Sequence, residues 1–383
     1  MLFETPRLTD EELEVAGRVD ELRRSLRHQV NSQPRRWTGS LRRVAFARAL
    51  LGSNTIEGYN VTLADAMALV EDEEPLDAAE ETRQAVVGYR DAMTYVLQLS
   101  NDPHFAYSEG LVRSLHFIML KYDMTKGPGL WRLGPVYVHN ETTGQNVYEG
   151  PSAEEVPSLI SELIGHLQLR DSDPPMVRAA MAHLNFVMVH PFRDGNGRMA
   201  RILQSLVLSQ EGILAPEFAS IEEYLGRRTQ DYYDVLARVG DGRWQPTRDA
   251  RPWIRFCLTA HFRQARTLAR RVRQSERLWT VLGEEAERHG LPERTVLALF
   301  DAAMRFRIKN SGYQELAEVS EYAGGRDLKR LVDLDLLEPR GEKRGRYYVG
   351  SQALFKLVQT AWEENRGLEQ EDPFESVQQR LAI

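Results

Sequence analysis

One stretch of twelve residues, His190 to Arg201, constrains this chain more than any other. It reads H-P-F-R-D-G-N-G-R-M-A-R and brings together an imidazole, a carboxylate, a Gly-Asn-Gly turn and two arginines. The preceding residues 174–189 are apolar almost all round, as expected of a helix buried inside a domain. Apolar residues then recur at helical spacing from Met199 to Val207. The sequence therefore predicts a tight polar loop between two core helices.

The composition of this loop indicates a phosphate site. Backbone N–H groups at a helix N-terminus point toward an anion, and glycine lets a ligand approach the backbone closely. Arg198 and Arg201, one turn apart, add planar charged donors for phosphate oxygens. Asp194 fits beside a phosphate if Mg²⁺ lies between them. His190 titrates near neutral pH, so we expect a general base. The residues alone predict Mg-nucleotide binding and transfer of a phosphorus-bearing group.

The loop also matches every specified position of the signature HxFx(D/E)GNGRxxR, so the chain resembles the Fic (Fido) family. The resemblance implies a protein adenylyltransferase, an enzyme that transfers AMP from ATP to a Tyr, Ser or Thr hydroxyl of a protein (AMPylation). It implies that His190 deprotonates the acceptor, that Asp194 holds Mg²⁺ and that Phe192 anchors the loop in the core. The implied phosphate-binding residues are Gly195, Asn196 and Gly197, which form the anion hole, and Arg198 and Arg201, which hold the distal phosphates.

A second short motif consists of Ser53, Glu57 and Gly58 and fits the pattern (S/T)xxxE(G/N). Serine and glutamate near a helix end followed by glycine are common helix-end chemistry. In many Fic proteins, however, this pattern is an inhibitory motif. We expect the Glu57 carboxylate to pair with Arg201 and to occupy donors that the γ-phosphate needs. ATP would then bind with its α-phosphate misplaced for in-line attack, so the sequence predicts a self-inhibited enzyme that needs no separate antitoxin chain.

Three further features are interpreted through the same resemblance. Residues 136–148 break the helical pattern around several turn formers and predict a β-hairpin. In the family this hairpin is a flap that aligns the target segment by strand addition; a plain surface hairpin is the alternative. Tyr232 and Tyr233 occupy the place of a tyrosine pair near the nucleotide, so either is expected on the adenine side, with helix packing as the alternative. His116 lies on an apolar helix face and is interpreted as a packing residue.

The C-terminal residues 276–352 have the pattern of a small winged helix-turn-helix. A helix over 313–322 is followed by an Ala-Gly-Gly turn at 323–325, a helix over 326–337 and a basic hairpin around 341–345. Basic side chains there suit phosphate contacts, but acidic neighbours dilute them, so DNA binding and protein docking both stay open. These basic residues are Arg326, Lys329, Arg330, Arg340, Lys343, Arg344 and Arg346.

The predicted fold class is mainly α: a Fic-type helical core with a β-hairpin flap, plus the winged-helix module. The expected parts are an N-terminal helical region with the inhibitory motif (1–105), the catalytic core (106–273), the module (276–352) and a C-terminal tail (353–383). A helix ending at about Arg273 is expected to close the core. The single cysteine, Cys257, excludes an intrachain disulfide and a thiol-rich metal site.

Composition limits the expected partners. The net charge of −7 gives no global affinity for nucleic acid, and no apolar run is long enough to span a bilayer. With no targeting segment at the N-terminus, the expected location is the cytoplasm, without membrane contact. The expected ligands are ATP, Mg²⁺ and a protein substrate, which can be the enzyme itself, and a homodimer is compatible with the family.

Two alternative functions remain open from the sequence. A de-AMPylase would use the same site to remove AMP, with Glu57 positioning a water molecule. A DNA-binding regulator would use the Fic core only to sense nucleotide. The intact His190 argues against the regulator, because sensing needs no base.

Overall fold

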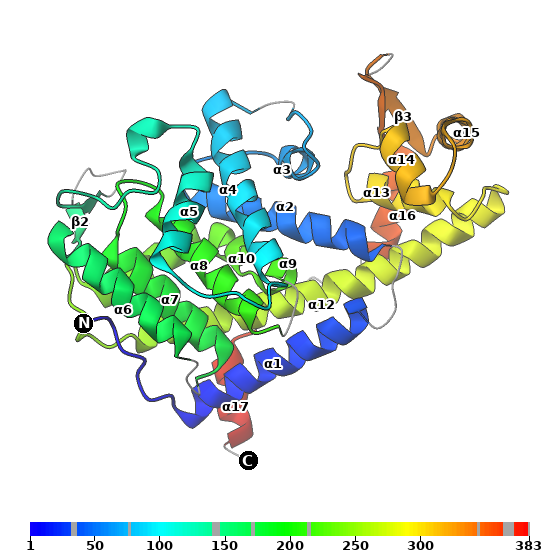
Figure 1. The fold of residues 1–383 in the computed structure, drawn as a ribbon. Helices are drawn as coiled ribbons and strands as arrows, with labels where there is room; N and C mark the ends of the chain where they lie inside the picture. Colours follow the sequence, from blue (N-terminus) through cyan, green and yellow to red (C-terminus); the bar gives the residue numbers. More distant parts are fainter. Residues whose placement is uncertain are drawn as a thin grey trace.

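The computed structural model describes residues 1–31, 37–75, 78–139, 146–169, 173–212, 216–342, 345–362 and 371–381. These residues form a mainly helical protein with two small antiparallel hairpins, as predicted (Figure 1). The N-terminal helices are α1 (Asp10–Asn31), α2 (Thr38–Ile56), α3 (Leu63–Val70) and α4 (Glu80–Leu99). Within the described ranges, no helix is long and apolar enough to cross a membrane.

Local sequence signals fix where the first helices start. Thr9 and Glu12 form a capping box at α1, with Thr9 N–H donating to Glu12 Oε2 at 2.9 Å and Glu12 N–H donating to Thr9 Oγ1 at 3.3 Å. Thr62 caps α3 by accepting from the Asp65 N–H at 3.1 Å. Both caps therefore behave as the Thr-x-x-acidic spacing predicts.

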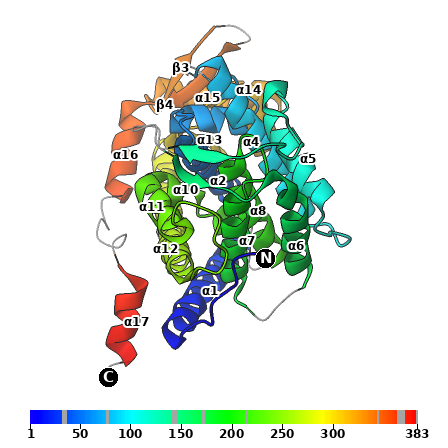
Figure 2. The ribbon, with the colours of Figure 1, turned by 90° about the vertical axis from the view of Figure 1, so that its left-hand side faces the viewer.

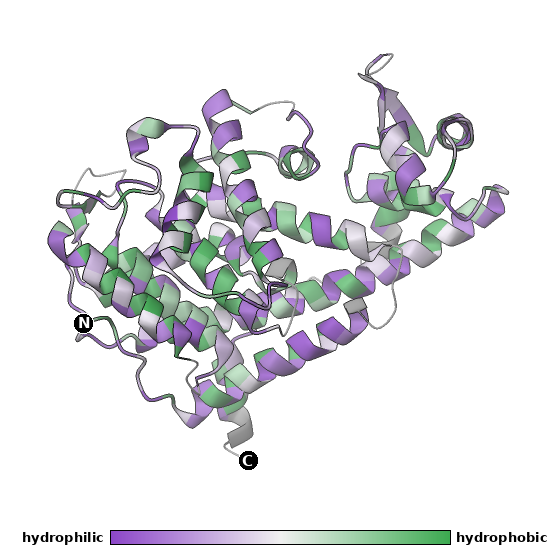
Figure 3. Ribbon diagram, viewed as in Figure 1, coloured by the Kyte–Doolittle hydropathy of each residue, from purple (hydrophilic) through white to green (hydrophobic). Residues whose placement is uncertain are grey.

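The middle of the chain forms the helical core that carries the loop. Its elements are α5 (Glu109–Leu120), a 3₁₀ helix η1 (Met124–Lys126), β1 (Tyr137–His139), β2 (Asn146–Glu149), η2 (Ala153–Glu155), α6 (Val156–Gln168), α7 (Pro175–Val189), α8 (Asn196–Gln210), α9 (Pro216–Ala219), α10 (Glu222–Arg227), α11 (Thr229–Gly240) and α12 (Arg251–Arg288). Helices α7 and α8 pack against each other at the centre, and Figure 3 shows α7 as mostly hydrophobic. The all-round apolar pattern of α7 is explained because neighbouring helices cover it on every side.

The hairpin of β1 and β2 confirms the expected extended segment, with Tyr137 opposite Glu149 and Val138 opposite Tyr148. The outer side of β2 is bridged by the segment before α12, where Glu149 N–H donates to Gly242 O at 3.0 Å and Trp244 N–H donates to Glu149 O at 2.9 Å. Because β2 is covered there, the edge that remains for another strand is that of β1.

Helix α2, which ends at the motif of Ser53, Glu57 and Gly58, is held by an unusually close helix contact. A Cβ on Gly52 would lie 2.3 Å from the Glu222 carbonyl oxygen, and a Cβ on Gly226 would lie 2.5 Å from the Gly52 Cα. Only glycine at both positions lets α2 and α10 approach to this distance. Arg48 of α2 adds an ion pair with Glu223 at 3.4 Å. The backbone of α2 is therefore fixed against α10.

Replacing Gly52 by alanine is expected to lower the free energy of unfolding by about 1–3 kcal/mol, because the added methyl group meets backbone rather than a flexible side chain. Gly17→Ala in α1 is the matched control, since no atom lies within 4 Å of its added Cβ; it is expected to stabilise by about 0.5–1 kcal/mol. Urea unfolding of both variants checks the pair. Equal stability of Gly52→Ala and the wild type would contradict the close contact.

The C-terminal residues form α13 (Thr295–Ala303), α14 (Asn310–Ala317), α15 (Glu321–Asp333), β3 (Leu337–Arg340), β4 (Tyr347–Gly350), α16 (Gln352–Trp362) and α17 (Pro373–Leu381). The antiparallel pair β3–β4 lies where the wing is expected, with Leu337 opposite Gly350. Arg43 of α2 donates to Asp301 of α13 at 2.9 Å, so this part contacts the helix that ends at Glu57. The winged-helix assignment stays a prediction, and Lys343 and Arg344 lie outside the described residues.

Two expectations for this part are wrong. The Ala-Gly-Gly segment 323–325 is not a turn: it belongs to the first turns of α15, and the chain reverses instead at Glu318, where φ is 53°. Gly324 is needed for packing, since a Cβ there would lie 2.8 Å from Asn310 Oδ1. The helix expected to end near Arg273 also continues to Arg288, because apolar residues such as Leu278 and Leu282 keep one face buried. The expected boundary near residue 276 thus falls inside α12, and the division into parts stays a prediction.

The last two helices return to the body of the protein. Helix α16 packs on α12 and α17 packs on α1, so the C-terminal residues lie beside the N-terminal helix (Figure 2). Arg255 of α12 lies over the Phe374 ring at 3.9 Å, and Gln378 donates to Glu11 at 3.1 Å. The predicted tail is therefore docked along two helices where it is described.

Candidate active site

His190 is the last residue of the turn that ends α7. Its backbone is left-handed, with φ 51° and ψ 58°, and its N–H donates to Phe186 O at 3.0 Å. The ring Nδ1 lies 3.0 Å from the Val187 carbonyl oxygen. A carbonyl can only accept, so Nδ1 carries the hydrogen and Nε2 of the neutral ring keeps a free lone pair. Burial lowers the pKa of His190 below its ordinary value, so the ring is neutral at pH 7.

Arg132 fixes the backbone around this histidine. Its Nε donates to His190 O at 2.8 Å and its Nη2 to Pro151 O at 2.6 Å, while its own N–H donates to Pro191 O at 2.9 Å. Nη1 donates to Gly134 O at 2.8 Å. The Arg132 guanidinium therefore connects the loop, through hydrogen bonds, to residues before and after the β1–β2 hairpin.

The anion hole predicted at Gly195, Asn196 and Gly197 lies at the N-terminus of α8. Gly195 has φ 76°, which favours glycine, and a Cβ there would lie 2.8 Å from Met119 Cε. The Asn196 side chain bonds both backbone groups of Phe192, each at 2.9 Å, so it shapes the loop rather than meeting a ligand. What Asn196 and Gly197 offer an anion is their backbone N–H at the start of the helix.

Phe192 anchors the loop as expected. It is fully buried and stacks on the His116 ring with centroids 3.6 Å apart. His116 in turn accepts from the Gly129 N–H at 2.8 Å, while its Nε2 lies 3.0 Å from Asp194 O. Burial lowers the pKa of His116 to about 4. The structure confirms His116 as a packing residue that holds the loop in place.

The arginines of the loop carry the strongest sign of a ligand. Arg198 and Arg201 are each 1% exposed, yet within the described part of the chain Arg198 Nε, Arg198 Nη1 and Arg201 Nη1 have no hydrogen-bond partner. Buried guanidinium nitrogens are normally paired, because an unpaired charged donor is costly. These donors lie within the first two turns of α8, beside its N-terminus. The arrangement suits an anion with several oxygen atoms.

The predicted contact between the two motifs is present. Arg201 Nη2 donates to Glu57 Oε1 at 2.7 Å, and Arg201 Nε donates to Ser53 Oγ at 2.7 Å. Although burial opposes the charge, the Glu57 carboxylate raises the pKa of Arg201. Gly58, with φ 80°, ends α2 as its left-handed cap and turns the chain away after Glu57.

Glu57 also occupies space beside the anion hole. A Cβ on Gly197 would lie 2.5 Å from Glu57 Oε1 and 3.3 Å from Arg201 Nη1. A side chain at position 197 would therefore overlap the carboxylate. The absence of a side chain on Gly197 also lets an anion approach the backbone closely.

Asp194 is the carboxylate of the loop and is partly exposed. Its Oδ1 accepts from the Gly195 N–H at 2.6 Å, and its Oδ2 lies 3.1 Å from Lys126 Nζ. Burial alone would raise the pKa of Asp194, but the hydrogen bond from Lys126 and the charge of Arg198 lower it. The group is an anion over the whole neutral range.

The residues fit Mg²⁺ held through a nucleotide better than a metal site made by protein alone. Among the described residues, no three His, Cys, Asp or Glu side chains gather to hold a metal ion. Asp194 therefore supplies one carboxylate near the unpaired arginine nitrogens. A single carboxylate plus phosphate oxygens is the usual protein environment of Mg²⁺.

The two tyrosines expected on the adenine side differ in position. Tyr232 is buried; its hydroxyl lies 3.1 Å from His183 Nε2 and its ring packs against Trp253. Tyr233 is 43% exposed, and its hydroxyl donates to Ile56 O at 3.0 Å, at the end of α2. Tyr232 is thus a packing residue in this structure. The adenine-side prediction remains for Tyr233.

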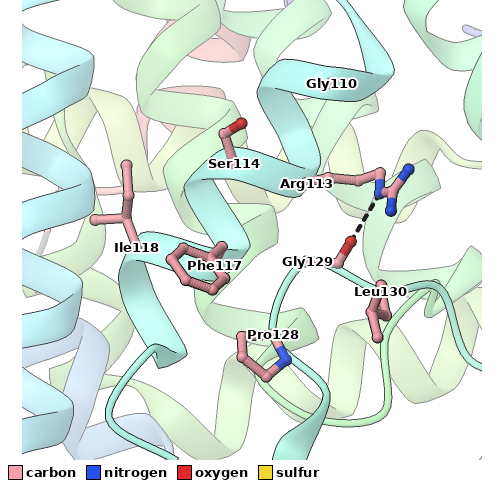
Figure 4. Close-up of a pocket in the computed structure, with 8 residues that line it drawn as sticks. All are labelled: Gly110, Arg113, Ser114, Phe117, Ile118, Pro128, Gly129 and Leu130. Carbon is pink, nitrogen blue, oxygen red and sulfur yellow. Dashed lines mark hydrogen bonds between the residues drawn. The ribbon is translucent and has the colours of Figure 1, made fainter. Parts of the chain in front are cut away.

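A separate pocket of about 440 Å³ lies between α5 and the segment before the hairpin (Figure 4). Its lining is mainly apolar, and the one charged side chain, Arg113, donates its Nε to Gly129 O at 2.7 Å. It lacks the donors of the loop and is not the anion site. The lining residues are Gly110, Arg113, Ser114, Phe117, Ile118, Pro128, Gly129 and Leu130.

The central part of the chain matches a known domain family. Residues 106–208 match the model of the Fic/DOC family, a range that contains α5, the hairpin, α7, the loop and most of α8. Residues 106–208 are therefore similar to the Fic domain.

Named relatives and solved structures agree with this class. The chain is 29% identical over 216 residues to the protein adenylyltransferase Fic of Culex quinquefasciatus (55% of this chain, 39% of that protein). It is 27% identical over 219 residues to the protein of the same name from Nematostella vectensis (55% and 46%). The match thus spans less than half the length of these curated relatives. A Fic family protein structure from Desulfovibrio desulfuricans G20 has a TM-score of 0.58 at 22% identity, covering 91% of this chain and 99% of that chain, and shows the fold.

Three residues of the site were missed by reasoning from the sequence. Arg132 lies in the segment just before the predicted hairpin, but its contacts with the loop backbone could not be read from the sequence. Lys126 and Tyr59 belong to neither motif. Only the folded chain brings η1 and the residues after Gly58 to the same loop.

Proposed function

We propose that this protein is a self-inhibited protein adenylyltransferase that transfers AMP from ATP to a hydroxyl group of a protein. The observation that carries the proposal is the set of buried, unpaired nitrogens of Arg198 and Arg201 beside the helix N-terminus and a neutral histidine. The names of the relatives support the same activity. An anion site alone would suit many proteins; the adjacent base selects a transfer reaction.

In this proposal His190 Nε2 accepts the proton of the acceptor hydroxyl. The hydroxyl oxygen attacks the α-phosphorus, the bond from that phosphorus to the bridging β-oxygen breaks, and pyrophosphate leaves. The N–H groups at the start of α8 stabilise negative charge on the phosphate, and Arg198 and Arg201 hold the distal phosphates. The Nδ1 contact with Val187 O keeps the imidazole in the tautomer that accepts at Nε2.

Asp194 would hold Mg²⁺ together with phosphate oxygens. When bound, the ion neutralises phosphate charge and orients the leaving group. The ionised state of Asp194 and its position after the anchored Phe192 support this role.

Inhibition in this proposal is competition for Arg201. The Glu57 carboxylate takes Nη2 at 2.7 Å, so a γ-phosphate cannot use that donor, and the α-phosphate is misplaced for attack. Since α2 is fixed against α10 by Gly52 and Gly226, relief of inhibition needs only the Glu57 side chain to leave. The target segment is proposed to add to β1, the open edge of the hairpin.

The test is a labelling experiment with the full chain, a cell lysate as the source of targets, and Mg²⁺. ATP labelled at the α-phosphate should mark protein when Glu57→Gly is used and not when His190→Ala is used. ATP labelled at the γ-phosphate is the control and should mark no more protein with Glu57→Gly than with His190→Ala, because that phosphate leaves in pyrophosphate. Labelling from the γ position above the level seen with His190→Ala would assign phosphoryl transfer instead and overturn the proposal.

The pH dependence of the AMP-transfer rate is expected to follow from the lowered pKa of His190. The reacting form is the neutral imidazole, whose fraction falls only when pH drops through the pKa. Burial places that pKa below the ordinary value of about 6.5, so the rate of Glu57→Gly is expected to stay level near pH 7 and to fall in the acidic range. Initial rates of α-phosphate labelling between pH 5 and 8, each at about the same saturation with nucleotide, check this. A rate that still rises steeply above pH 7 would contradict it.

A further inference from the structure

The loop carboxylate has a cationic partner that neither motif contains. Lys126 ends η1, and its Nζ lies 3.1 Å from Asp194 Oδ2 and donates to the Tyr59 hydroxyl at 3.2 Å. The Tyr59 and Tyr122 ring centroids lie 5.9 and 5.7 Å from the same nitrogen. The side chain is only 19% exposed. The ammonium is thus held in a defined place in front of Asp194.

We propose that Lys126 is the resting counter-ion of Asp194 and that a divalent cation must displace it before Mg-nucleotide is held. The inference rests on the proposed function, in which Asp194 binds Mg²⁺. A magnesium ion binds a carboxylate oxygen at about 2.0–2.1 Å, whereas the ammonium already lies within hydrogen-bonding distance of Oδ2. Two cations on one carboxylate oxygen repel each other strongly where water is partly excluded. Lys126 therefore lowers the affinity of this carboxylate for the metal ion.

The surroundings give the displaced ammonium a place to go. The Tyr59 hydroxyl remains as an acceptor, and the nucleotide that accompanies the metal brings new anionic oxygens. The Arg198 guanidinium lies 5.1 Å from the Tyr59 ring centroid, and its unpaired Nε and Nη1 indicate where such oxygens bind. Exchange of one anion for another leaves Lys126 paired in both states.

The same segment also supports the inhibitory contact. Tyr59 follows Glu57 by two residues, across the left-handed turn at Gly58. Glu57 holds the phosphate-binding Arg201, while Tyr59 holds the lysine that covers the metal-binding carboxylate. Residues 57–59 therefore support both halves of the resting site. The two contacts are separable, because they use different side chains.

The test measures how much Mg²⁺ is needed for nucleotide binding, with a fluorescent non-hydrolysable ATP analogue and the full chain. Lys126→Met removes the charge at similar length and is expected to lower the half-saturating Mg²⁺ concentration about three- to tenfold. Lys126→Arg keeps the charge and should stay within about twofold of the wild type. Lys126→Gln repeats the test if the methionine variant is unstable. Mn²⁺ bound in the presence of the analogue, followed by electron paramagnetic resonance, gives a direct second readout.

The outcomes separate this inference from the proposed function. An unchanged or higher Mg²⁺ requirement in Lys126→Met overturns the role of Lys126. If Asp194→Asn weakens Mg²⁺-dependent binding while Lys126→Met behaves as the wild type, Asp194 remains the metal ligand and only the counter-ion role fails. If Asp194→Asn leaves the Mg²⁺ dependence unchanged, the metal-binding part of the proposed function fails as well.

Discussion

Replacing Glu57 by glycine is expected to raise the rate of AMP transfer about ten- to a hundredfold, because it frees a buried donor for the γ-phosphate. A hydrogen bond to a charged group is worth about 1.5–3 kcal/mol, which corresponds to about one to two powers of ten in rate. The bond in question joins Arg201 Nη2 to Glu57 Oε1 at 2.7 Å. Initial rates of α-phosphate labelling, compared at equal enzyme concentration, measure the change.

A matched control is Glu71→Gly, which also replaces a glutamate by glycine at the end of a helix. Glu71 follows α3 and pairs with Arg43 at 2.8 Å, far along the chain from Arg201. Glu71→Gly should leave the labelling rate near that of the wild type. Equal rates for Glu57→Gly and Glu71→Gly would argue against inhibition by Glu57. A fall in labelling, with release of AMP from a labelled target by the wild type, would favour the removal reaction.

Glu57→Gly is also expected to lower the free energy of unfolding, and bound nucleotide should reverse this loss. Without Glu57, the Arg201 guanidinium stays buried and loses its carboxylate partner. Because Glu57 is 24% exposed and partly screened, we expect a loss of about 1–3 kcal/mol, less than for a fully buried pair. A bound phosphate replaces the carboxylate, so ATP should raise the Tm of Glu57→Gly more than that of the wild type.

The part of the fold that carries the site could be predicted well from the sequence, and the physical reason is local. An apolar helix, a loop with glycine at its positive-φ position and a second amphipathic helix are encoded in consecutive residues, and α7, the loop and α8 follow that order. The pairing of Glu57 with Arg201 was also expected, but through a resemblance rather than through spacing. Residues 144 positions apart give no local signal of contact.

What could not be predicted depends on packing between distant segments. Gly324 and Gly325 suggested a turn because glycine favours turns. Both instead lie in α15, where Gly324 allows close helix packing, and sequence alone does not separate these uses. The sequence predicted Asn196 as part of the anion hole, but it did not show that the Asn196 side chain bonds the Phe192 backbone. Lys126 was missed for a related reason, since a lone lysine in a short 3₁₀ turn resembles any surface lysine until the fold places it beside Asp194.

Removing the His190 imidazole is expected to lower the rate of AMP transfer by about 10²–10⁴-fold, the range typical of a lost general base. The measurement is single-turnover labelling from α-labelled ATP in the Glu57→Gly background, where the starting rate is high enough for such a loss to be followed. Nucleotide affinity should change little, because the proposed phosphate donors belong to α8 and its arginines rather than to the imidazole.

Two replacements separate the ring from the backbone that carries it. His190 has φ 51°, a conformation that asparagine tolerates better than alanine, so His190→Asn preserves the turn at the end of α7 while lacking a base of suitable pKa. Both variants should lose transfer, and His190→Asn should still bind the ATP analogue as the wild type does. If His190→Asn kept transfer while His190→Ala lost both transfer and binding, the histidine would matter for the shape of the turn, and proton transfer would have to be assigned elsewhere.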